Sequence, residues 1–117
     1  MASIKAVGGS PATGHYGAAK AGVVSLSKTA AIEMRDYGVR VNAVCPGWVD
    51  TDMVNDNKSA LEAILPVSFD DYIGHVQGRL GHVDDIVGVV SFLASDRSRF
   101  SSGSTYVVDG GATSHLV

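Results

Sequence analysis

The sequence predicts an α/β fold in which a small parallel sheet carries helices on its faces. Short runs rich in β-branched residues alternate with longer segments of helical periodicity. Glycine- and proline-containing turns separate these segments. Strands that alternate with helices favour parallel pairing through right-handed crossovers, which gives this fold class.

A helix is expected over residues 15–37. Apolar side chains recur there at spacings of three and four, which indicates one buried stripe on the helix. The stripe consists of Tyr16, Ala19, Val23, Leu26, Ala30 and Met34. Gly38 is the expected C-cap of this helix, because glycine tolerates the left-handed backbone that ends many helices.

The strands are short. A strand stub is expected at the start of the chain, a second strand over residues 39–45 before Pro46, and a last strand over residues 104–108. The last helix is expected to begin at Val83, since two acidic residues follow where they favour a helix N-terminus.

The intervening residues 50–78 are less regular. Polar turns there alternate with two helical stretches, near residues 60–65 and 69–76. A long excursion with weak structure is more often functional than idle.

Composition excludes several classes of protein. The 117 residues suit one domain, and 45% hydrophobic with 18% charged residues is a packed composition. A net charge of −3 supplies no basic patch for nucleic acid or an anionic membrane. No apolar stretch is long enough to cross a bilayer, and no signal peptide is visible at the start. The lone Cys45 fits a reducing, cytoplasmic setting.

One pair of residues has the spacing of an acid–base site. Tyr16 and Lys20 are four residues apart, so on a helix they share one face. An ammonium beside a phenol favours loss of the phenolic proton, and such a phenol can act as a general acid or base. Taken alone, this spacing is common on helices, and a purely structural role is the more frequent explanation.

The wider context changes that weighting. Ser3 precedes Tyr16 with twelve residues between them, so the chain resembles the short-chain dehydrogenase/reductase family with its S-x12-Y-x3-K pattern. Further blocks that resemble the classical branch of this family follow in family order. They cover residues 16–23, 38–51, 78–81 and 103–111.

The resemblance implies a partial Rossmann-like, doubly wound parallel sheet built from the family's strands five, six and seven. Residues 1–117 would be the C-terminal portion of that domain. Its catalytic helix would span residues 15–37, its substrate lid about 54–78, and its last helix and strand 83–108.

The resemblance also implies roles for single residues. Tyr16 would be the general acid or base, Lys20 would assist it and bind the nicotinamide ribose, and Ser3 would hydrogen-bond the substrate oxygen. The nicotinamide end of NAD or NADP would meet a loop containing Pro46, Gly47, Val49 and Thr51. The implied reaction is hydride transfer between nicotinamide and a carbonyl or secondary alcohol of a small molecule, with no metal ion.

The family's G-x-x-x-G-x-G fingerprint, which holds the pyrophosphate, appears nowhere in these residues. Two hypotheses follow. The first is an NAD(P)-dependent oxidoreductase present as its C-terminal half. The second is a truncated, catalytically silent module that keeps only packing and oligomerisation surfaces. In either case the resemblance implies a homo-oligomer, or assembly with an intact relative.

Several other residues that could belong to a functional site have structural explanations. The histidines lack metal-ligand spacing and are expected to be surface or loop residues, namely His15, His75, His82 and His115. Cys45 is expected to be buried at a strand end, and Asp109 to belong to a turn. Trp48 and Phe69 could line a substrate pocket or pack in the core.

Overall fold

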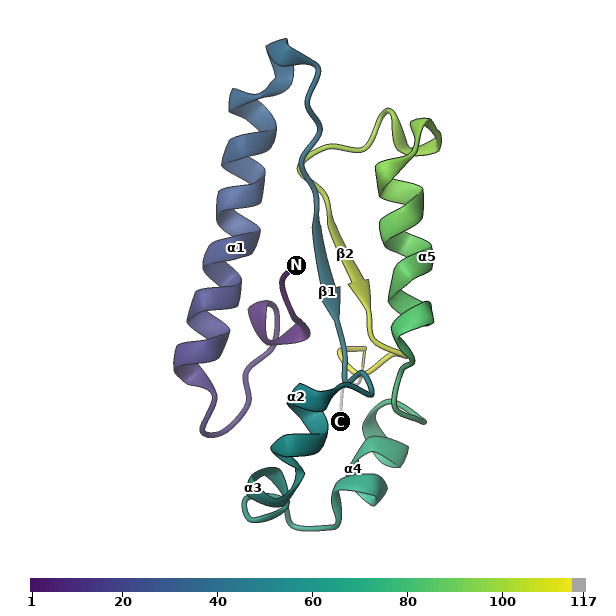
Figure 1. The fold of residues 1–117 in the computed structure, drawn as a ribbon. Helices are drawn as coiled ribbons and strands as arrows, with labels where there is room; N and C mark the ends of the chain where they lie inside the picture. The colour runs from purple at the N-terminus through teal and green to yellow at the C-terminus, as the bar shows by residue number, and fades with distance from the viewer. Residues whose placement is uncertain (115–117) are drawn as a thin grey trace.

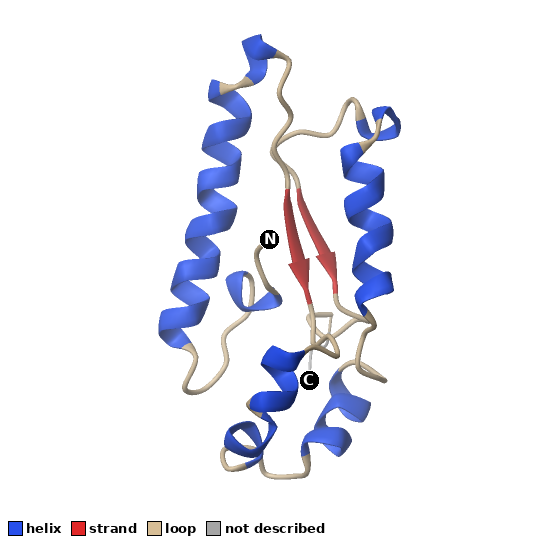
Figure 2. Ribbon diagram, viewed as in Figure 1, coloured by secondary structure: helices blue, strands red, loops and turns tan. Residues whose placement is uncertain are grey.

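A computed structural model describes residues 1–114, so the expectation for His115 lies outside the described residues. Figure 1 shows the order of the elements and Figure 2 their types. The α-helices are α1 (Gly14–Glu33), α2 (Asp52–Asp56), α3 (Lys58–Glu62), α4 (Phe69–Val76) and α5 (Val83–Ala94). The strands are β1 (Ala43–Pro46) and β2 (Thr105–Val108). Single turns of 3-10 helix are η1 (Ile4–Ala6), η2 (Arg35–Tyr37) and η3 (Asp96–Ser98).

The two strands form a parallel sheet, which confirms the predicted fold class. Ala43 lies opposite Thr105, and Pro46 lies opposite Val108. Helices α1 and α5 flank the strands on opposite sides (Figure 1). The short helices α2, α3 and α4, which follow β1, lie beyond the carboxyl ends of both strands (Figure 1), which is where ligands bind in open α/β sheets.

The expected first strand does not form. Residues 1–3 lie beside β1, and the Ala2 N–H donates to the Val44 carbonyl at 2.7 Å. The chain then turns at once into η1, so the segment is too short to continue a ladder. The three-strand sheet expected from the sequence is therefore two paired strands and one adjoining hydrogen bond.

The second strand is shorter at its start than expected, because side chains take over from ladder hydrogen bonds. The Arg40 guanidinium donates to the carbonyls of Leu93, Ser95 and Ser101 at 2.8, 3.3 and 3.1 Å. These contacts fasten the approach to β1 to the C-terminal end of α5.

The expected helix over residues 15–37 is nearly continuous. Helix α1 ends at Glu33, and η2 carries the turn on to Tyr37. Gly38 then adopts φ 69°, the left-handed C-cap that the sequence predicted.

The expected buried stripe on α1 is wrong in part. Leu26 is 69% exposed, and Ala19 and Met34 are exposed as well. Of the residues in α1, Ala31 is the one that is fully buried. The helix meets its neighbours along a narrow line of small residues. For example, a Cβ on Gly17 would lie 3.0 Å from the Lys5 carbonyl oxygen, a tight contact, so glycine at this position favours the close approach of η1 to α1.

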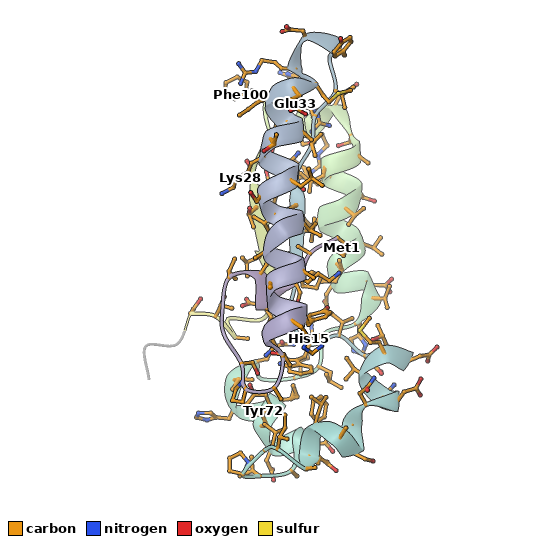
Figure 3. The ribbon with its side chains drawn as sticks, turned by 90° about the vertical axis from the view of Figure 1, so that its left-hand side faces the viewer. Met1, His15, Lys28, Glu33, Tyr72 and Phe100 are labelled. Carbon is orange, nitrogen blue, oxygen red and sulfur yellow. The ribbon has the colours of Figure 1, made fainter. Side chains whose placement is uncertain are left out.

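The described chain is elongated. Its extents are 49 × 29 × 27 Å, and its radius of gyration is 15.5 Å, against about 13 Å for a compact domain of this length. Its accessible surface is 7495 Å², where roughly 6,000 Å² is usual for this mass. Large apolar side chains such as Leu26, Ile32 and Phe100 therefore remain exposed (Figure 3 labels Phe100).

The buried side chains form a small core around β1 and a second one in the lid. Phe69 and Ile73 are buried on the inner face of α4, with Phe69 only 1% exposed. This confirms the packing explanation for Phe69. Within residues 1–114, no helix combines the length and the apolar character needed to span a membrane.

Candidate active site

Tyr16 and Lys20 lie together on the first turns of α1. Both side chains are half-buried, and the Lys20 ammonium nitrogen is 5.6 Å from the centroid of the Tyr16 ring. The four-residue spacing on one helix face produces this arrangement. A phenol and an ammonium therefore point to the same side of the helix, which is the geometry that an assisted proton transfer needs.

Ser3 lies in the segment that passes beside this pair. The Lys20 ammonium donates to the Met1 carbonyl at 3.4 Å, which draws the Ser3 segment toward α1. Ser3 is 8% exposed, and its hydroxyl accepts the Lys5 N–H at 3.2 Å to cap η1. No hydrogen bond within residues 1–114 joins the Ser3 hydroxyl to the Tyr16 phenol, so the structure gives Ser3 a local capping role beside the pair.

The loop after β1 presents the backbone N–H of Val49 as a donor. Val49 and Gly81 form a parallel bridge, in which the Gly81 N–H donates to the Trp48 carbonyl at 2.9 Å and the Asp50 N–H to the Gly81 carbonyl at 2.8 Å. Because this bridge uses the groups on either side of Val49, the N–H and C=O of Val49 point away from Gly81. The Thr51 hydroxyl donates to that C=O at 3.3 Å. The Val49 N–H has no acceptor within the described residues.

Gln77 fixes this loop, and the sequence analysis missed it. Its amide oxygen accepts the Trp48 N–H at 2.8 Å, and its amide nitrogen donates to the carbonyls of Trp48 and Arg79 at 2.7 and 2.9 Å. The residue follows α4 and lies 29 positions from Trp48 in the chain. No local pattern could reveal that pairing, because only the fold brings the two segments together.

Glycine at position 47 is required by this arrangement. A Cβ there would overlap the Gln77 amide oxygen and lie 2.9 Å from the Cα of Asp109. A Cβ on Gly110, whose φ is 59°, would lie 2.8 Å from the Gln77 carbonyl oxygen. The loop, the end of α4 and the turn after β2 therefore meet backbone to backbone, and packing accounts for Gly47 without a ligand.

Trp48 lies at the centre of an aromatic cluster. Its ring meets Phe69 edge-on at 5.5 Å between centroids and Tyr72 edge-on at 6.4 Å. The Lys5 ammonium lies 5.2 Å from the centroid of the Trp48 ring. Burial lowers the pKa of Lys5, because water that would stabilise its charge is partly excluded. The sequence analysis did not single out Lys5, since a lysine in a turn gives no sign of being partly buried.

Asp85 belongs to the start of α5, as expected for the acidic pair there. Its carboxylate accepts two hydrogen bonds from the Arg79 guanidinium, at 2.8 and 3.1 Å, and one from the His82 N–H at 2.7 Å. The Arg79 hydrogen bonds and then the His82 N–H hold the pKa of Asp85 at about 2. Asp85 thus closes the N-terminal end of the helix.

Asp109 belongs to a turn, as the sequence predicted. Its carboxylate accepts the N–H groups of Gly111 and Thr113 at 3.0 and 2.8 Å, and the Thr113 hydroxyl at 2.6 Å. Burial would raise the pKa of Asp109, but these hydrogen bonds to its charged form outweigh burial and lower it. Cys45 is fully buried in β1, and burial raises the pKa of its thiol. Within residues 1–114, no three candidate ligands gather as a metal site would require.

The loop fits one end of a nicotinamide cofactor. An amide-bearing ring needs a backbone donor with no other partner, and the Val49 N–H provides one at the carboxyl end of β1. Lys20 would supply an ammonium for the adjoining ribose hydroxyls. The pyrophosphate has no corresponding glycine-rich cradle in these 117 residues.

Comparison with known proteins identifies the family of the chain. The family model described as enoyl-(acyl carrier protein) reductase matches residues 1–113. The chain is 40% identical over 115 residues to an NADP-dependent (R)-specific alcohol dehydrogenase of Lentilactobacillus kefiri, covering 97% of this chain and 44% of the relative. It is 40% identical over 111 residues to an L-rhamnose 1-dehydrogenase (NAD(P)(+)) of Azotobacter vinelandii, covering 95% and 42%.

Solved structures agree as well. The crystal structure of an F189W actinorhodin polyketide ketoreductase with NADPH superposes with a TM-score of 0.90 at 30% identity, over 97% of this chain and 46% of that one. Levodione reductase gives a TM-score of 0.88 at 32% identity, over 98% and 45%. The chain thus spans less than half the length of the relatives that it matches. It belongs to the short-chain dehydrogenase/reductase family.

Proposed function

We propose that this chain carries the acid–base half of an NAD(P)-dependent oxidoreductase that interconverts a carbonyl group and a secondary alcohol in a small molecule. The single observation that carries the proposal is the Tyr16–Lys20 pair, with its 5.6 Å separation of ammonium and ring, at the carboxyl end of the sheet. The relatives named above as dehydrogenases and reductases support the reaction class.

In this proposal Tyr16 donates its phenolic proton to the carbonyl oxygen during reduction and takes it back during oxidation. Lys20 holds a positive charge beside the ring, which stabilises the phenolate that remains. Ser3 donates a hydrogen bond from its hydroxyl to the same substrate oxygen and keeps its proton, while its own oxygen still accepts the Lys5 N–H. NAD or NADP, when bound, supplies or accepts the hydride.

The loop after β1 would position the nicotinamide end. The Val49 N–H would donate to the carboxamide, and Thr51 would turn its hydroxyl from the Val49 carbonyl toward the cofactor. Pro46 and Gly47 would set the path of the loop, since Gly47 admits Gln77 and Asp109 at close range. Residues 15–37 are proposed as the catalytic helix and 54–78 as the lid.

The experiment is a turnover assay of the polypeptide as its gene encodes it, with NADH and NADPH and a panel of ketones. Tyr16→Phe, which removes the hydroxyl and keeps the ring, is expected to lower kcat by at least a hundredfold. Lys20→Met, which removes the ammonium beside the ring, is the second variant. Lys28→Met is its matched control, because Lys28 is exposed on the same helix (Figure 3). Full turnover by Tyr16→Phe would refute the assignment.

Coenzyme titration separates the two hypotheses from the sequence. Tight binding of either coenzyme supports the enzyme. A folded polypeptide that binds neither would favour the silent packing module instead. We propose a homo-oligomer in both cases, which the exposed apolar residues of α1 and α5 support, such as Leu26, Ile32, Val87 and Val90. We also propose a cytoplasmic setting, supported by the buried, unpaired thiol of Cys45.

A further inference from the structure

We propose that Lys5 binds an anionic group of the substrate, so that the compound reduced at Tyr16 is an oxo acid or a similar anionic ketone. This inference rests on the proposed function and narrows its substrate class. Nothing in the acid–base chemistry of Tyr16, Lys20 and Ser3 uses the Lys5 ammonium.

Lys5 lies close to the helix turn that carries Tyr16. A hollow of about 410 Å³ lies between η1 with its following loop and the N-terminal turns of α1. Its walls consist of residues 5–10, Thr13, Gly14, Gly17, Ala18 and Ala21. Lys5 lies on one wall, and Gly17, the neighbour of Tyr16 in the chain, lies on the other. The Lys5 carbonyl oxygen would lie 3.0 Å from a Cβ built on Gly17, so the two backbones approach closely. The Lys5 residue is thus next to the turn that carries the proposed general acid.

The Lys5 side chain points toward the lid. The Lys5 ammonium reaches across to the Trp48 ring at 5.2 Å, and Trp48 contacts the lid residues Phe69 and Tyr72. Lys5 therefore spans from the helix of Tyr16 to the base of the lid. In this proposal the substrate lies between Tyr16 and the lid aromatics, with this ammonium at its side.

The charge of Lys5 has no carboxylate partner within residues 1–114. The ion pairs within residues 1–114 are Lys58 with Asp70 and Arg79 with Asp85, so no described carboxylate neutralises Lys5. Burial alone accounts for its lowered pKa. A partly dehydrated ammonium has lost solvation that a carboxylate can replace, and the attraction is stronger in such surroundings than in water. The Trp48 ring lies 5.2 Å from the ammonium and carries no formal charge, so it does not neutralise the cation.

Binding can be measured without turnover. Trp48 is the single tryptophan of the chain and lies beside Lys5, so its fluorescence should report a ligand at this position. The probes are 4-oxopentanoate and its methyl ester, which share the ketone and differ in charge. We expect the acid to bind at least tenfold more tightly than the ester. Equal affinities for acid and ester would overturn the proposal.

Variants test whether Lys5 causes the preference. Lys5→Met keeps the length of the side chain and removes the charge, so the acid should bind no better than the ester. Lys5→Arg keeps the charge and should keep the preference. Lys28→Met removes an equal charge from the exposed face of α1 and should leave the preference unchanged. A preference that survives in Lys5→Met, or disappears in Lys28→Met, would contradict the proposal.

A measurement on the unaltered protein guards against a variant that does not fold. Acetylation of lysines by an amine-reactive ester is followed by peptide mass spectrometry. 4-Oxopentanoate should slow modification of Lys5 severalfold and leave Lys28 unaffected, whereas equal rates at Lys5 with and without the acid would refute direct contact. Failure of the enzyme proposal is distinguishable: Tyr16→Phe should lose turnover but still bind the acid more tightly than the ester, because Lys5 is unaltered.

Discussion

The side-chain amide of Gln77 pairs with both backbone polar groups of Trp48, accepting its N–H at 2.8 Å and donating to its carbonyl at 2.7 Å. Here a side-chain amide makes the two hydrogen bonds that the backbone of a neighbouring strand would otherwise make. It joins the end of α4 to the loop that presents the Val49 N–H. The position of that donor therefore depends on a residue of the proposed lid.

Replacing Gln77 should release the loop. Gln77→Leu keeps the bulk but leaves the Trp48 N–H without its partner, and we expect a loss of about 1–3 kcal/mol in the free energy of unfolding. Faster hydrogen exchange at the Trp48 amide is the specific signal. Asn57→Ala is the control, because it also removes an amide-to-backbone hydrogen bond, but that bond goes to Met53 and not to Trp48. Unchanged exchange at Trp48 in Gln77→Leu would contradict this account.

Two glycine substitutions should act in opposite directions. Gly47→Ala would force a methyl group against Gln77 and the backbone of Asp109, so we expect destabilisation of at least about 1–3 kcal/mol. Gly88 lies inside α5 with nothing within 4 Å of a built Cβ. Gly88→Ala should stabilise by roughly 0.5–1 kcal/mol. Urea unfolding of both variants provides the test, and equal signs would refute it.

Asp85 should make stability depend on pH in the acidic range. Its pKa is about 2 in the folded chain against an ordinary value of 3.8. Because the folded pKa is the lower one, the stabilisation is present above pH 3.8 and disappears as pH falls toward 2. Wild type should exceed Asp85→Asn in stability near neutral pH, and the difference should disappear over this window. Asp84→Asn is the matched control, since the Arg79 guanidinium contacts Asp85.

The exposed apolar residues of α1 should drive self-association. Leu26 is 69% exposed and Ile32 is exposed on the same helix, in a chain whose surface is larger than its mass requires. Sedimentation velocity should show an average mass that rises with concentration, and Leu26→Glu should lower it. Lys28→Glu, a charge change on the exposed side of α1, is the control. A mass independent of concentration in the unaltered chain would contradict the expectation.

Local chemistry explains which elements could be predicted from sequence. The helix over residues 69–76, the start of α5 at Val83 and the left-handed Gly38 follow from apolar spacing, acidic first-turn residues and glycine's backbone freedom. The exposure of Leu26 could not be predicted, because periodicity marks an apolar face without showing that anything covers it.

The candidate site divides in the same way. The contact between Tyr16 and Lys20 follows from a four-residue spacing on one helix. The cap that Ser3 provides for Lys5 is local too, although the sequence analysis gave Ser3 another role. The contacts of Lys5 and Gln77 with Trp48 join residues far apart in the chain, so they depend on the tertiary fold alone.

The carbonyl of Trp48 accepts two donors, the Gln77 amide and the Gly81 N–H, one from each side of the turn between α4 and α5. A ligand that moves the lid must then also move the Trp48 peptide group, which lies at the end of the strand where a coenzyme would bind. By thermodynamic reciprocity, two ligands at these positions change each other's affinity by the same factor. Cooperativity between coenzyme and lid ligand would thus depend on one peptide group.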